Sequence, residues 1–371
     1  MAVAVTGIAL VTALGRNTET TWQNLLKGHS AITLRQPVVT LPPLPIAMVG
    51  KYPSRLEDLL LAATKAALTD AHLSESLEAC GVVIGSSRGH QAQWEWFLTG
   101  GQADGWLESL PHMAAIAVAR AIGSQGPVLA PMTACATGLW AIAQGTDLIR
   151  SGQCDRVLVG AGEAAITPLT LTGFQQMRAL AKTGCYPFDQ RREGLVLGEG
   201  AAILVLESAK LAHRRSARIY GYVLGAGLTA DANHISAPDS TSHQGGLTAI
   251  QTCLQHSHLA PASVGLIHAH GTSTRLNDAY EAALIQTVFS SSVNVTATKG
   301  ATGHTLGASG AIGAAFCLLA LQTQNLPPCT GLQVPDFDLN LVRTAQPAKL
   351  STALCLSFGF GGQNAAIAFR R

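Results

Sequence analysis

The chain has 371 residues, of which 47% are hydrophobic and 12% are charged, and its formal net charge is +2. This length and apolar content favour one large or two closely packed domains with an extensive core, and they exclude a disordered protein. The small net charge and the lack of a long basic run argue against a nucleic-acid or membrane partner.

Short apolar runs rich in β-branched residues predict two sets of buried strands. The first set is Val3–Ala9, Gly81–Ile84, Val128–Ala130, Val157–Val159 and Ala202–Leu206. The second set is Ile219–Ala226, Val264–His268, Val293–Ala297, Ala353–Ser357 and Ala365–Phe369. Helical patterns lie between them at Leu56–Ala71, Met113–Ala121, Leu139–Arg150, Gly245–Gln255, Ala279–Val288 and Gly310–Thr323. This alternation predicts an α/β fold with parallel sheets and crossover helices.

The two halves of the chain follow the same plan. In each half a strand leads through small residues into a helix, first in "VLAPMTACATGLWAIAQG" and later in "VNVTATKGATGHTLGASGAIGA", and a hairpin-like pair of strands follows. An internal duplication predicts two similar sheets stacked face to face, with the active site between them. We place the boundary near residue 208, which gives domains 1–208 and 209–371.

Three observations bear on where the protein works. The apolar start, residues 1–15, has no charged leading segment and is interrupted by Thr6 and Gly7, so a strand and a turn are favoured over a signal peptide. The apolar run Ala311–Leu321 is too short to span a bilayer. Eight cysteines lack CxxC spacing, which indicates neither a zinc site nor a disulfide framework. We expect reduced, buried cysteines and a cytoplasmic location.

Cys135, in "MTACATGLW", is the first candidate for chemistry. It lies where an apolar strand meets a helix whose first turn holds only small residues. Unpaired amides and the positive end of the helix dipole at such a place favour a thiolate. Considered alone, Cys135 could also be a small cysteine of the core.

Three further segments carry candidate groups. His270 follows a buried strand and precedes two threonines, while Lys299 and His304 lie in a glycine-rich turn before a helix. The third segment, "LSFGFGGQN", allows backbone amides to approach a ligand closely. Each has a plainer alternative: a hydrogen-bonded core histidine, a packing or phosphate-binding turn, and a tight hairpin. A Walker-type nucleotide site is disfavoured because no GxxxxGK[ST] pattern is present.

Together these segments resemble the β-ketoacyl-[acyl-carrier-protein] synthases of the elongating, Cys-His-His type. The resemblance runs almost end to end, through "TACATG", "PFDQRREGLVLGEGAAILVLE", "TADANHISAP", "AHGTST", "KGATGHTLGASG" and "SFGFGG". It implies a thiolase fold, with duplicated βαβαβ halves in α-β-α-β-α layers. It also implies condensation of an acyl-enzyme with malonyl thioester in fatty acid or polyketide synthesis. The implied partner is an acyl carrier protein whose phosphopantetheine carries the substrates, with no metal and no tightly bound cofactor.

The resemblance also assigns roles to individual residues. Cys135 would hold the acyl chain, His270 and His304 would stabilise the enolate, and Lys299 would support this pair together with Asp278 or Glu281. The backbone amides of Cys135 and Phe360 would form the oxyanion hole. The remaining implied contacts are Gly359 and Gly361 beside the Phe360 gate, Thr272 and Thr274 on phosphopantetheine, Phe174 and Phe358 on substrate, and Arg178 on the carrier protein.

Three positions depart from the family pattern. Leu356 replaces an asparagine, Gly313 replaces a glutamate, and His268 stands where asparagine or glutamate is frequent. These changes put the normal rate and any structural cation in doubt. Two alternatives to an active synthase stay open: a catalytically silent partner subunit that sets chain length in a heterodimer, and a degradative thiolase acting on coenzyme A thioesters.

Strand 128–130 bears on assembly. It lacks the charged or proline-guarded pattern of a free sheet edge, so we expect it to pair with its own copy in a homodimer.

Overall fold

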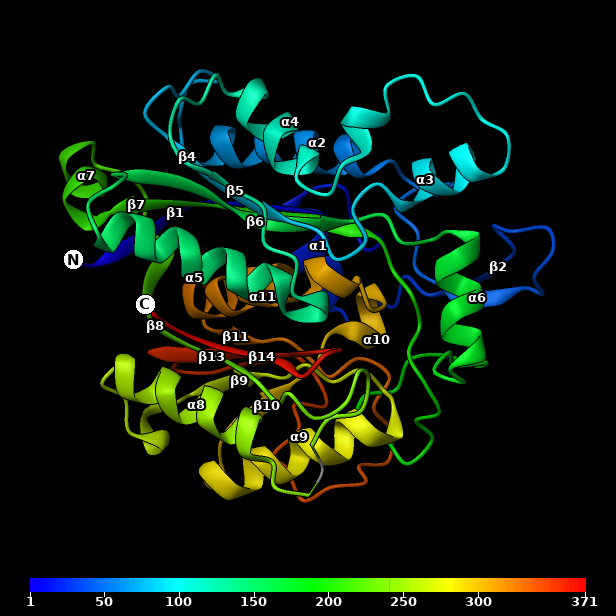
Figure 1. Ribbon diagram of the computed structural model, residues 1–371. Coiled ribbons are helices and arrows are strands. Elements are labelled where there is room, and N and C mark those ends of the chain that lie inside the picture. Colours follow the sequence, from blue (N-terminus) through cyan, green and yellow to red (C-terminus); the bar gives the residue numbers. More distant parts are fainter. Residues whose placement is uncertain (240) are drawn as a thin grey trace.

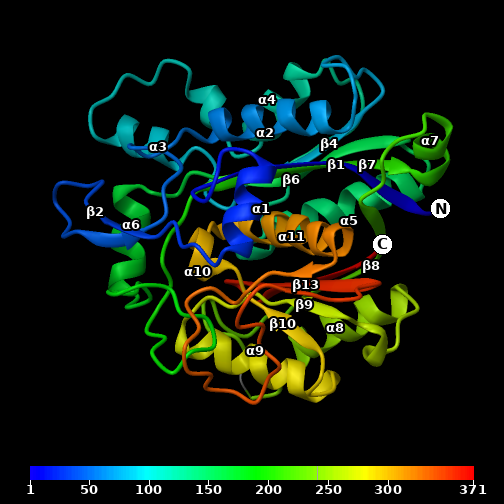
Figure 2. The same ribbon diagram turned by 180° about the vertical axis from the view of Figure 1, so that it is seen from behind.

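The structure is a computed structural model that describes residues 1–239 and 241–371, and its elements form five layers. Helices α2 (Leu56–Asp70) and α4 (Met113–Ala121) cover one sheet of strands, and α8 (Gln244–His256) and α9 (Arg275–Val288) cover another (Figure 1). Helices α5 (Thr137–Arg150) and α11 (Ser309–Thr323) lie between the sheets, as the reverse view also shows (Figure 2). The predicted α-β-α-β-α layering is confirmed.

The principal strands follow the same spatial order in both halves. The order is β5-β4-β6-β7-β1 in the first half and β10-β9-β13-β14-β8 in the second, so each half places its own strands as third, second, fourth, fifth, first. These strands are β1 (Val3–Thr12), β4 (Gly81–Gly85), β5 (Val128–Leu129), β6 (Arg156–Glu163), β7 (Gly200–Ser208), β8 (Gly221–Ala230), β9 (Leu266–His268), β10 (Asn294–Thr296), β13 (Thr352–Gly359) and β14 (Gln363–Arg370). A duplicated plan in the sequence therefore has a duplicated topology. The predicted parallel sheets are wrong in part: β4, β5 and β6 pair in parallel, as do β9, β10 and β13, but β1, β7, β8 and β14 pair antiparallel with their neighbours, so each set of strands is mixed.

The two sheets are joined, which the sequence did not predict. Residues Val3–Val5 of β1 pair antiparallel with Gly221–Val223 of β8, and this short ladder makes the two sets of strands one ten-stranded sheet. Elsewhere the layers separate around α5 and α11. The boundary near residue 208 stays a proposal; β7 ends at Ser208, and a short helix leads on to β8.

Smaller elements decorate this framework. They are α1 (Thr18–Leu26), β2 (Thr33–Arg35), β3 (Leu44–Ile46), α3 (Gln91–Leu98), α6 (Pro168–Gln176), α7 (Ala209–Arg214), α10 (Lys299–Thr302), β11 (Asn325–Leu326) and β12 (Gln346–Pro347), with 3₁₀ turns at Trp106–Ser109, Ala134–Ala136, Pro261–Ser263 and Leu306–Ala308. Helix α6 lies beside the central layer, close to the site described below (Figure 1).

Helix α11 is apolar on every side because both of its faces are covered. Every residue from Ser309 to Leu321 is buried between the sheets. The stretch Leu306–Thr323 has the length and hydropathy of a membrane-crossing helix, yet 89% of it is buried inside the fold. A helix that is hydrophobic all round is typical of the core of a large protein.

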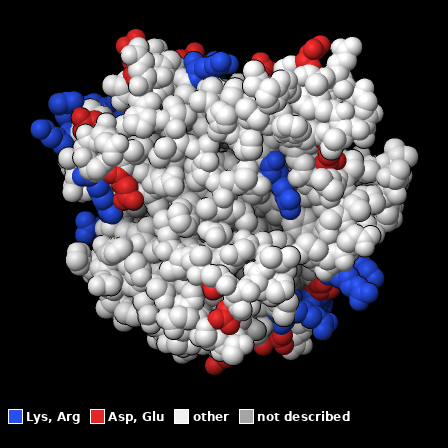
Figure 3. Space-filling model, in the orientation of Figure 1, with Lys and Arg blue, Asp and Glu red and all other residues white. Residues whose placement is uncertain are grey.

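Two expectations about the rest of the molecule can be compared with the structure. All eight cysteines are free and buried, as predicted. On the face shown in Figure 3, Lys and Arg side chains lie mainly near the margins and do not form a continuous basic field.

Strand β5 is the terminal strand of the sheet, pairing with β4 alone, and Leu129 on it is 38% exposed.

Candidate active site

A cavity of about 320 Å³ is lined by residues of both halves. Of the residues that the sequence singled out, it brings together Cys135, Phe174, Arg178, His270, Thr272, Thr274, His304, Phe358, Gly359 and Phe360. Lys299, Asp278 and Glu281 are buried outside this lining, and Gly362 rather than Gly361 contributes to the wall. Residues separated by more than 200 positions in the chain therefore share one site.

Cys135 lies on a strained turn at the start of α5. It occupies the middle of the 3₁₀ turn Ala134–Ala136, which leads directly into the helix. Ala134 has φ +47°, a left-handed conformation that residues with a side chain rarely adopt. This turn redirects the chain between β5 and α5 and places the thiol at the wall of the cavity.

The C-terminal glycine loop packs against the backbone of Cys135. A Cβ atom at Gly359 would lie 3.0 Å from the Cys135 nitrogen and 2.9 Å from the Thr133 oxygen, so only glycine permits this approach. The Phe360 amide donates a hydrogen bond toward the Cys135 thiol. The Phe360 ring lies 6.0 Å from the Phe174 ring, and the two aromatic rings border the cavity.

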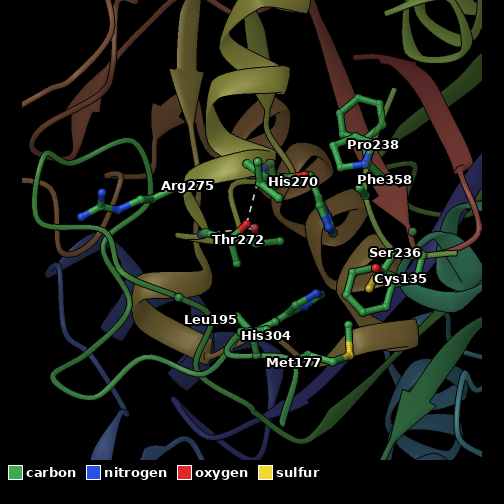
Figure 4. A pocket seen from close by; sticks show the side chains of 18 of the residues that line it. Cys135, Met177, Leu195, Ser236, Pro238, His270, Thr272, Arg275, His304 and Phe358 are labelled. Atoms are coloured by element: carbon green, nitrogen blue, oxygen red, sulfur yellow. Dashed lines mark hydrogen bonds between the residues drawn. The ribbon is translucent and has the colours of Figure 1, made fainter. Parts of the chain in front are cut away.

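Cys135 and two histidines form the centre of the cavity. The thiol sulfur and one ring nitrogen from each of His270 and His304 all lie within 4.8 Å of one another. The two imidazoles meet edge to face, with ring centroids 5.2 Å apart. Figure 4 shows both rings pointing into the space beside Cys135, while Arg275 lies at the opposite side of the cavity.

His270 is held by its backbone as well as by its ring. Its own N–H and that of Gly271 donate to the two carboxylate oxygens of Glu281, at 2.6 and 2.7 Å. The Lys299 amine lies 3.3 Å from His270 Nδ1 and also donates to the His270 carbonyl. Because a donor faces Nδ1, the ring carries its proton on Nε2, and Nε2 can donate a hydrogen bond to a ligand.

His304 is fixed by the turn between α10 and α11. Its amide donates to the Val196 carbonyl at 2.6 Å, and its Nδ1 lies 2.9 Å from the Ser309 hydroxyl. The Thr305 hydroxyl lies 3.1 Å from the same Ser309 oxygen. A ring engaged at Nδ1 leaves Nε2 for the cavity, as for His270.

Burial decides the protonation of the central groups. It lowers the pKa of both His270 and His304 well below the usual histidine value, and the charge of Lys299 lowers both further. Both imidazoles are therefore neutral at pH 7. Burial raises the pKa of the Cys135 thiol to about 11, and the opposing charges of Lys299 and Arg88 do not overcome it. Burial therefore opposes the thiolate that the helix start is expected to favour, and the thiolate at Cys135 stays a prediction.

The acidic supports take different positions. Asp278 accepts hydrogen bonds from the Phe188 and Ser273 amides and so holds a neighbouring loop. Burial raises the pKa of Asp278 to about 6 and also raises that of Glu281. Among the described residues Lys299 forms no ion pair with either carboxylate; it meets Glu281 only through the His270 backbone that both contact.

The departures at Gly313 and His268 compensate for each other. A Cβ at Gly313 would lie 2.8 Å from the His268 ring, so the imidazole occupies the space that a side chain there would fill. His268 is buried, and its Nε2 lies 3.0 Å from the hydroxyl of Thr298. Thr298 directly precedes Lys299 in the chain. The His268 ring therefore fills the space that a glutamate at position 313 would occupy.

Several supporting residues were missed by sequence reasoning. Glu163 is fully buried and accepts hydrogen bonds from Ser86, Ser87, Arg88 and the Gly307 amide. Ser357 donates to the Cys135 carbonyl at 2.9 Å. The one available signal for Glu163 was a charge at the end of an apolar strand, where a carboxylate needs partners if it is buried.

Cys135, His270 and His304 also offer the donor atoms of a three-ligand zinc site.

Comparisons with known proteins address the same site. A family described as "Beta-ketoacyl synthase, N-terminal domain" matches residues 1–44 and 51–212, and "Beta-ketoacyl synthase, C-terminal domain" matches residues 220–333. The chain belongs to the β-ketoacyl synthase family. The matched N-terminal part contains Cys135, and the matched C-terminal part contains His270, Lys299 and His304.

Individual β-ketoacyl synthases match over the whole chain. The 3-oxoacyl-[acyl-carrier-protein] synthase 2 of Staphylococcus aureus is 33% identical, covering 100% of this chain and 98% of the relative. The ishigamide ketosynthase/chain length factor has a TM-score of 0.91 at 28% identity, covering 100% and 98% of the two chains. A type II polyketide ketosynthase solved with its acyl-carrier protein has a TM-score of 0.92 at 27% identity, covering 100% and 99%.

Proposed function

We propose that the protein is an active 3-oxoacyl-[acyl-carrier-protein] synthase that joins an acyl group to malonyl-[acyl-carrier-protein] with loss of carbon dioxide. The observation that carries the proposal is the convergence of the Cys135 sulfur and the His270 and His304 ring nitrogens within 4.8 Å in one cavity. The relatives named above supply the substrate class, because the bacterial one is a 3-oxoacyl-[acyl-carrier-protein] synthase.

In the first half-reaction Cys135 takes the acyl group. The sulfur attacks the thioester carbonyl of the incoming acyl chain, and the carbonyl oxygen becomes negative beside the amides of Cys135 and Phe360. The carbon–sulfur bond to phosphopantetheine then breaks, and the thiol proton of Cys135 ends on the released phosphopantetheine thiol. Thr272 and Thr274, whose hydroxyls lie 2.9 Å apart at the cavity wall, suit contacts to the phosphopantetheine arm.

In the second half-reaction a malonyl thioester replaces the released carrier. His270 and His304 donate through Nε2 to its thioester oxygen, so the electron pair left by departing carbon dioxide forms an enolate at that oxygen. The enolate carbon attacks the acyl-Cys135 carbonyl, the carbon–sulfur bond breaks, and the cysteine sulfur takes a proton from solvent. Neutral imidazoles suit this work because each keeps one N–H for the oxygen.

A silent chain-length subunit is the alternative. A subunit that only shapes a partner's tunnel has no need of a thiol with two imidazole nitrogens within 4.8 Å. The combined presence of Cys135, His270, Lys299 and His304 therefore favours catalysis. We further propose a cytoplasmic location, since eight free cysteines suit a reducing compartment.

Intact mass spectrometry after incubation with a panel of acyl carrier proteins tests the proposal. We expect the enzyme to gain the mass of one acyl group and peptide mapping to place it on Cys135. Loading from acyl-coenzyme A but from no carrier protein would favour a thiolase instead. Loading on any of the other seven cysteines would contradict the assignment.

We also propose a homodimer joined through β5. This strand is the free end of the sheet, its Leu129 and the nearby Met132 are exposed, and self-pairing would cover an unguarded edge. Such an isologous interface buries roughly 2,000 Å² or more when it is obligate. We predict a dimer in sedimentation at micromolar concentration. A stable monomer that still condenses acyl and malonyl thioesters would contradict this assembly.

A further inference from the structure

Arg88 carries a positive charge close to the nucleophile but has no partner for it. It lies on the turn that follows β4, and its guanidinium carbon is 5.7 Å from the centre of the Phe174 ring. Within residues 1–239 and 241–371 the guanidinium makes neither an ion pair nor a side-chain hydrogen bond. Arg88 is exposed and lies outside the cavity lining; its defined side-chain contact is with Phe174, which does line the cavity.

The backbone beneath Arg88 is held rigidly. Glu163 accepts hydrogen bonds from the Ser86 hydroxyl at 2.7 Å, the Ser87 amide at 2.9 Å and the Arg88 amide at 3.2 Å. The same carboxylate accepts from the Gly307 amide at 2.9 Å, which ties this turn to the one before α11. A fixed backbone and an unengaged side chain are what a group needs if it is to meet a ligand.

The duplicated fold places Arg88 opposite His270. Strand β4 is the second strand of the first half and β9 is the second strand of the other half. Arg88 follows the end of β4 by three residues, and His270 follows the end of β9 by two. Cys135 lies between these strand ends, and the charges of Arg88 and Lys299 both act on its thiol.

The two sides of Cys135 differ in character. On the side of His270, Thr272 and Thr274 provide polar contacts for the carrier arm and the malonyl group. On the other side, the Phe174–Phe360 pair forms an apolar passage with Arg88 at its margin. An acyl chain held on Cys135 and directed past Phe174 comes within reach of the guanidinium.

The chemistry of guanidinium defines what that chain should carry. A methyl-ended chain offers the exposed Arg88 guanidinium no hydrogen-bond acceptor, so it gains nothing by reaching this side chain. A carboxylate would accept two parallel N–H donors from the planar guanidinium. We propose that Arg88 selects acyl groups whose far end bears a carboxylate. This assignment rests on the proposed function, because it requires an acyl group on Cys135.

Matched pairs of acyl carrier proteins test the selection. At each of several chain lengths, the rate of acyl-Cys135 formation is measured by intact mass spectrometry for a methyl-ended chain and for its ω-carboxylate counterpart. At the preferred length we expect the wild type to load the carboxylate at least tenfold faster. Arg88→Met should reduce that ratio at least tenfold, because loss of the charge beside the Cys135 thiol affects the loading of both chains alike whereas loss of the carboxylate partner affects only one; Arg88→Lys should fall between them.

Controls separate the possible failures. Arg120→Met, which removes an exposed arginine of α4, should leave the ratio unchanged. A wild-type preference for methyl-ended chains at every length, or an unchanged ratio in Arg88→Met, would overturn the role of Arg88 while the proposed function stands. If Arg88→Met leaves the ratio unchanged but dissociates a dimer, the guanidinium pairs with the partner subunit instead. Failure of every acyl group to load would contradict the proposed function and this assignment together.

Discussion

The turn before α5 and the turn before α11 hold matching positions in the two halves, but they differ in what their backbone amides contact. Ala134 at φ +47° precedes Cys135 in the first, and Leu306 at φ +40° precedes Gly307 in the second. The Gly307 amide is bound by the carboxylate of Glu163, the last residue of β6. Gly359, the last residue of β13, has no side chain and lies against the Cys135 amide.

This difference shows how a duplicated fold acquires one active site. Glu163 satisfies the amide of the second turn internally, so that turn is structural. Gly359 at the matching position has no carboxylate to bind the Cys135 amide, which suits the proposed oxyanion hole. The second half instead contributes Lys299 and His304 from the segment before α11, and His270 from the segment after β9.

The largest effect on activity should come from removing the Cys135 thiol from the turn before α5. Cys135→Ala should abolish acyl loading and condensation, because Cys135 is the one thiol among the described residues that line the cavity. The fold should persist, since alanine is smaller and equally compatible with a helix start. Mass spectrometry and circular dichroism check both points, and acylation that survives in this variant would refute the nucleophile.

The next largest effect should come from the imidazoles of the second half. Replacing His270 or His304 by alanine should slow carbon dioxide release from malonyl carrier protein by about 100- to 1000-fold, the usual cost of losing one oxyanion donor. Acyl transfer to Cys135 should be affected less. Exposed His29 provides a control, since His29→Ala should change neither rate. Unaltered carbon dioxide release in both variants would contradict their role.

The protonation state of the Cys135 thiol can be followed by its rate of alkylation. Because burial raises the Cys135 pKa to about 11, the thiolate fraction is small at pH 7 and increases as the pH rises toward that value. The rate of Cys135 alkylation by iodoacetamide should therefore rise about tenfold per pH unit between pH 7 and 10. Peptide mass spectrometry measures it. A rate that is already constant above pH 8 would indicate a thiolate in the resting enzyme.

A smaller effect should follow from loosening the second turn. Glu163→Gln places an amide donor where several N–H and O–H groups need an acceptor, which should reduce the free energy of unfolding by about 1–3 kcal/mol. Urea unfolding compared with exposed Glu78→Gln checks this expectation. Equal stability of the two variants would show that the carboxylate does not hold the turn.

Sequence reasoning succeeded where local pattern decides the structure. The ten predicted strands and six predicted helices all lie where the structure has them, because apolar runs and helical periodicity are local signals. The shorter elements, such as β2, β3, α6 and α10, were not predicted. The bridge between β1 and β8 escaped it, since pairing of Val3–Val5 with Gly221–Val223 has no local signature. The order of motifs, rather than their composition, indicated the site.

The supports of the site could not be predicted for a related reason. Glu163 acts on Gly307, 144 residues away, and the His268 ring fills space beside Gly313. Both depend on which surfaces meet after folding. For Cys135, the helix start that favours a thiolate can be read from the sequence, whereas the burial that opposes it cannot.

The most direct test of the account is a single-turnover chase. Acyl-Cys135 enzyme is first prepared from an acyl carrier protein and freed of excess donor, and malonyl carrier protein is then added. The account predicts that the acyl mass leaves Cys135 as carbon dioxide is released, and that it reappears on the carrier protein as a 3-oxoacyl chain two carbons longer. Loss of the acyl group as free acid, without an extended chain, would contradict it.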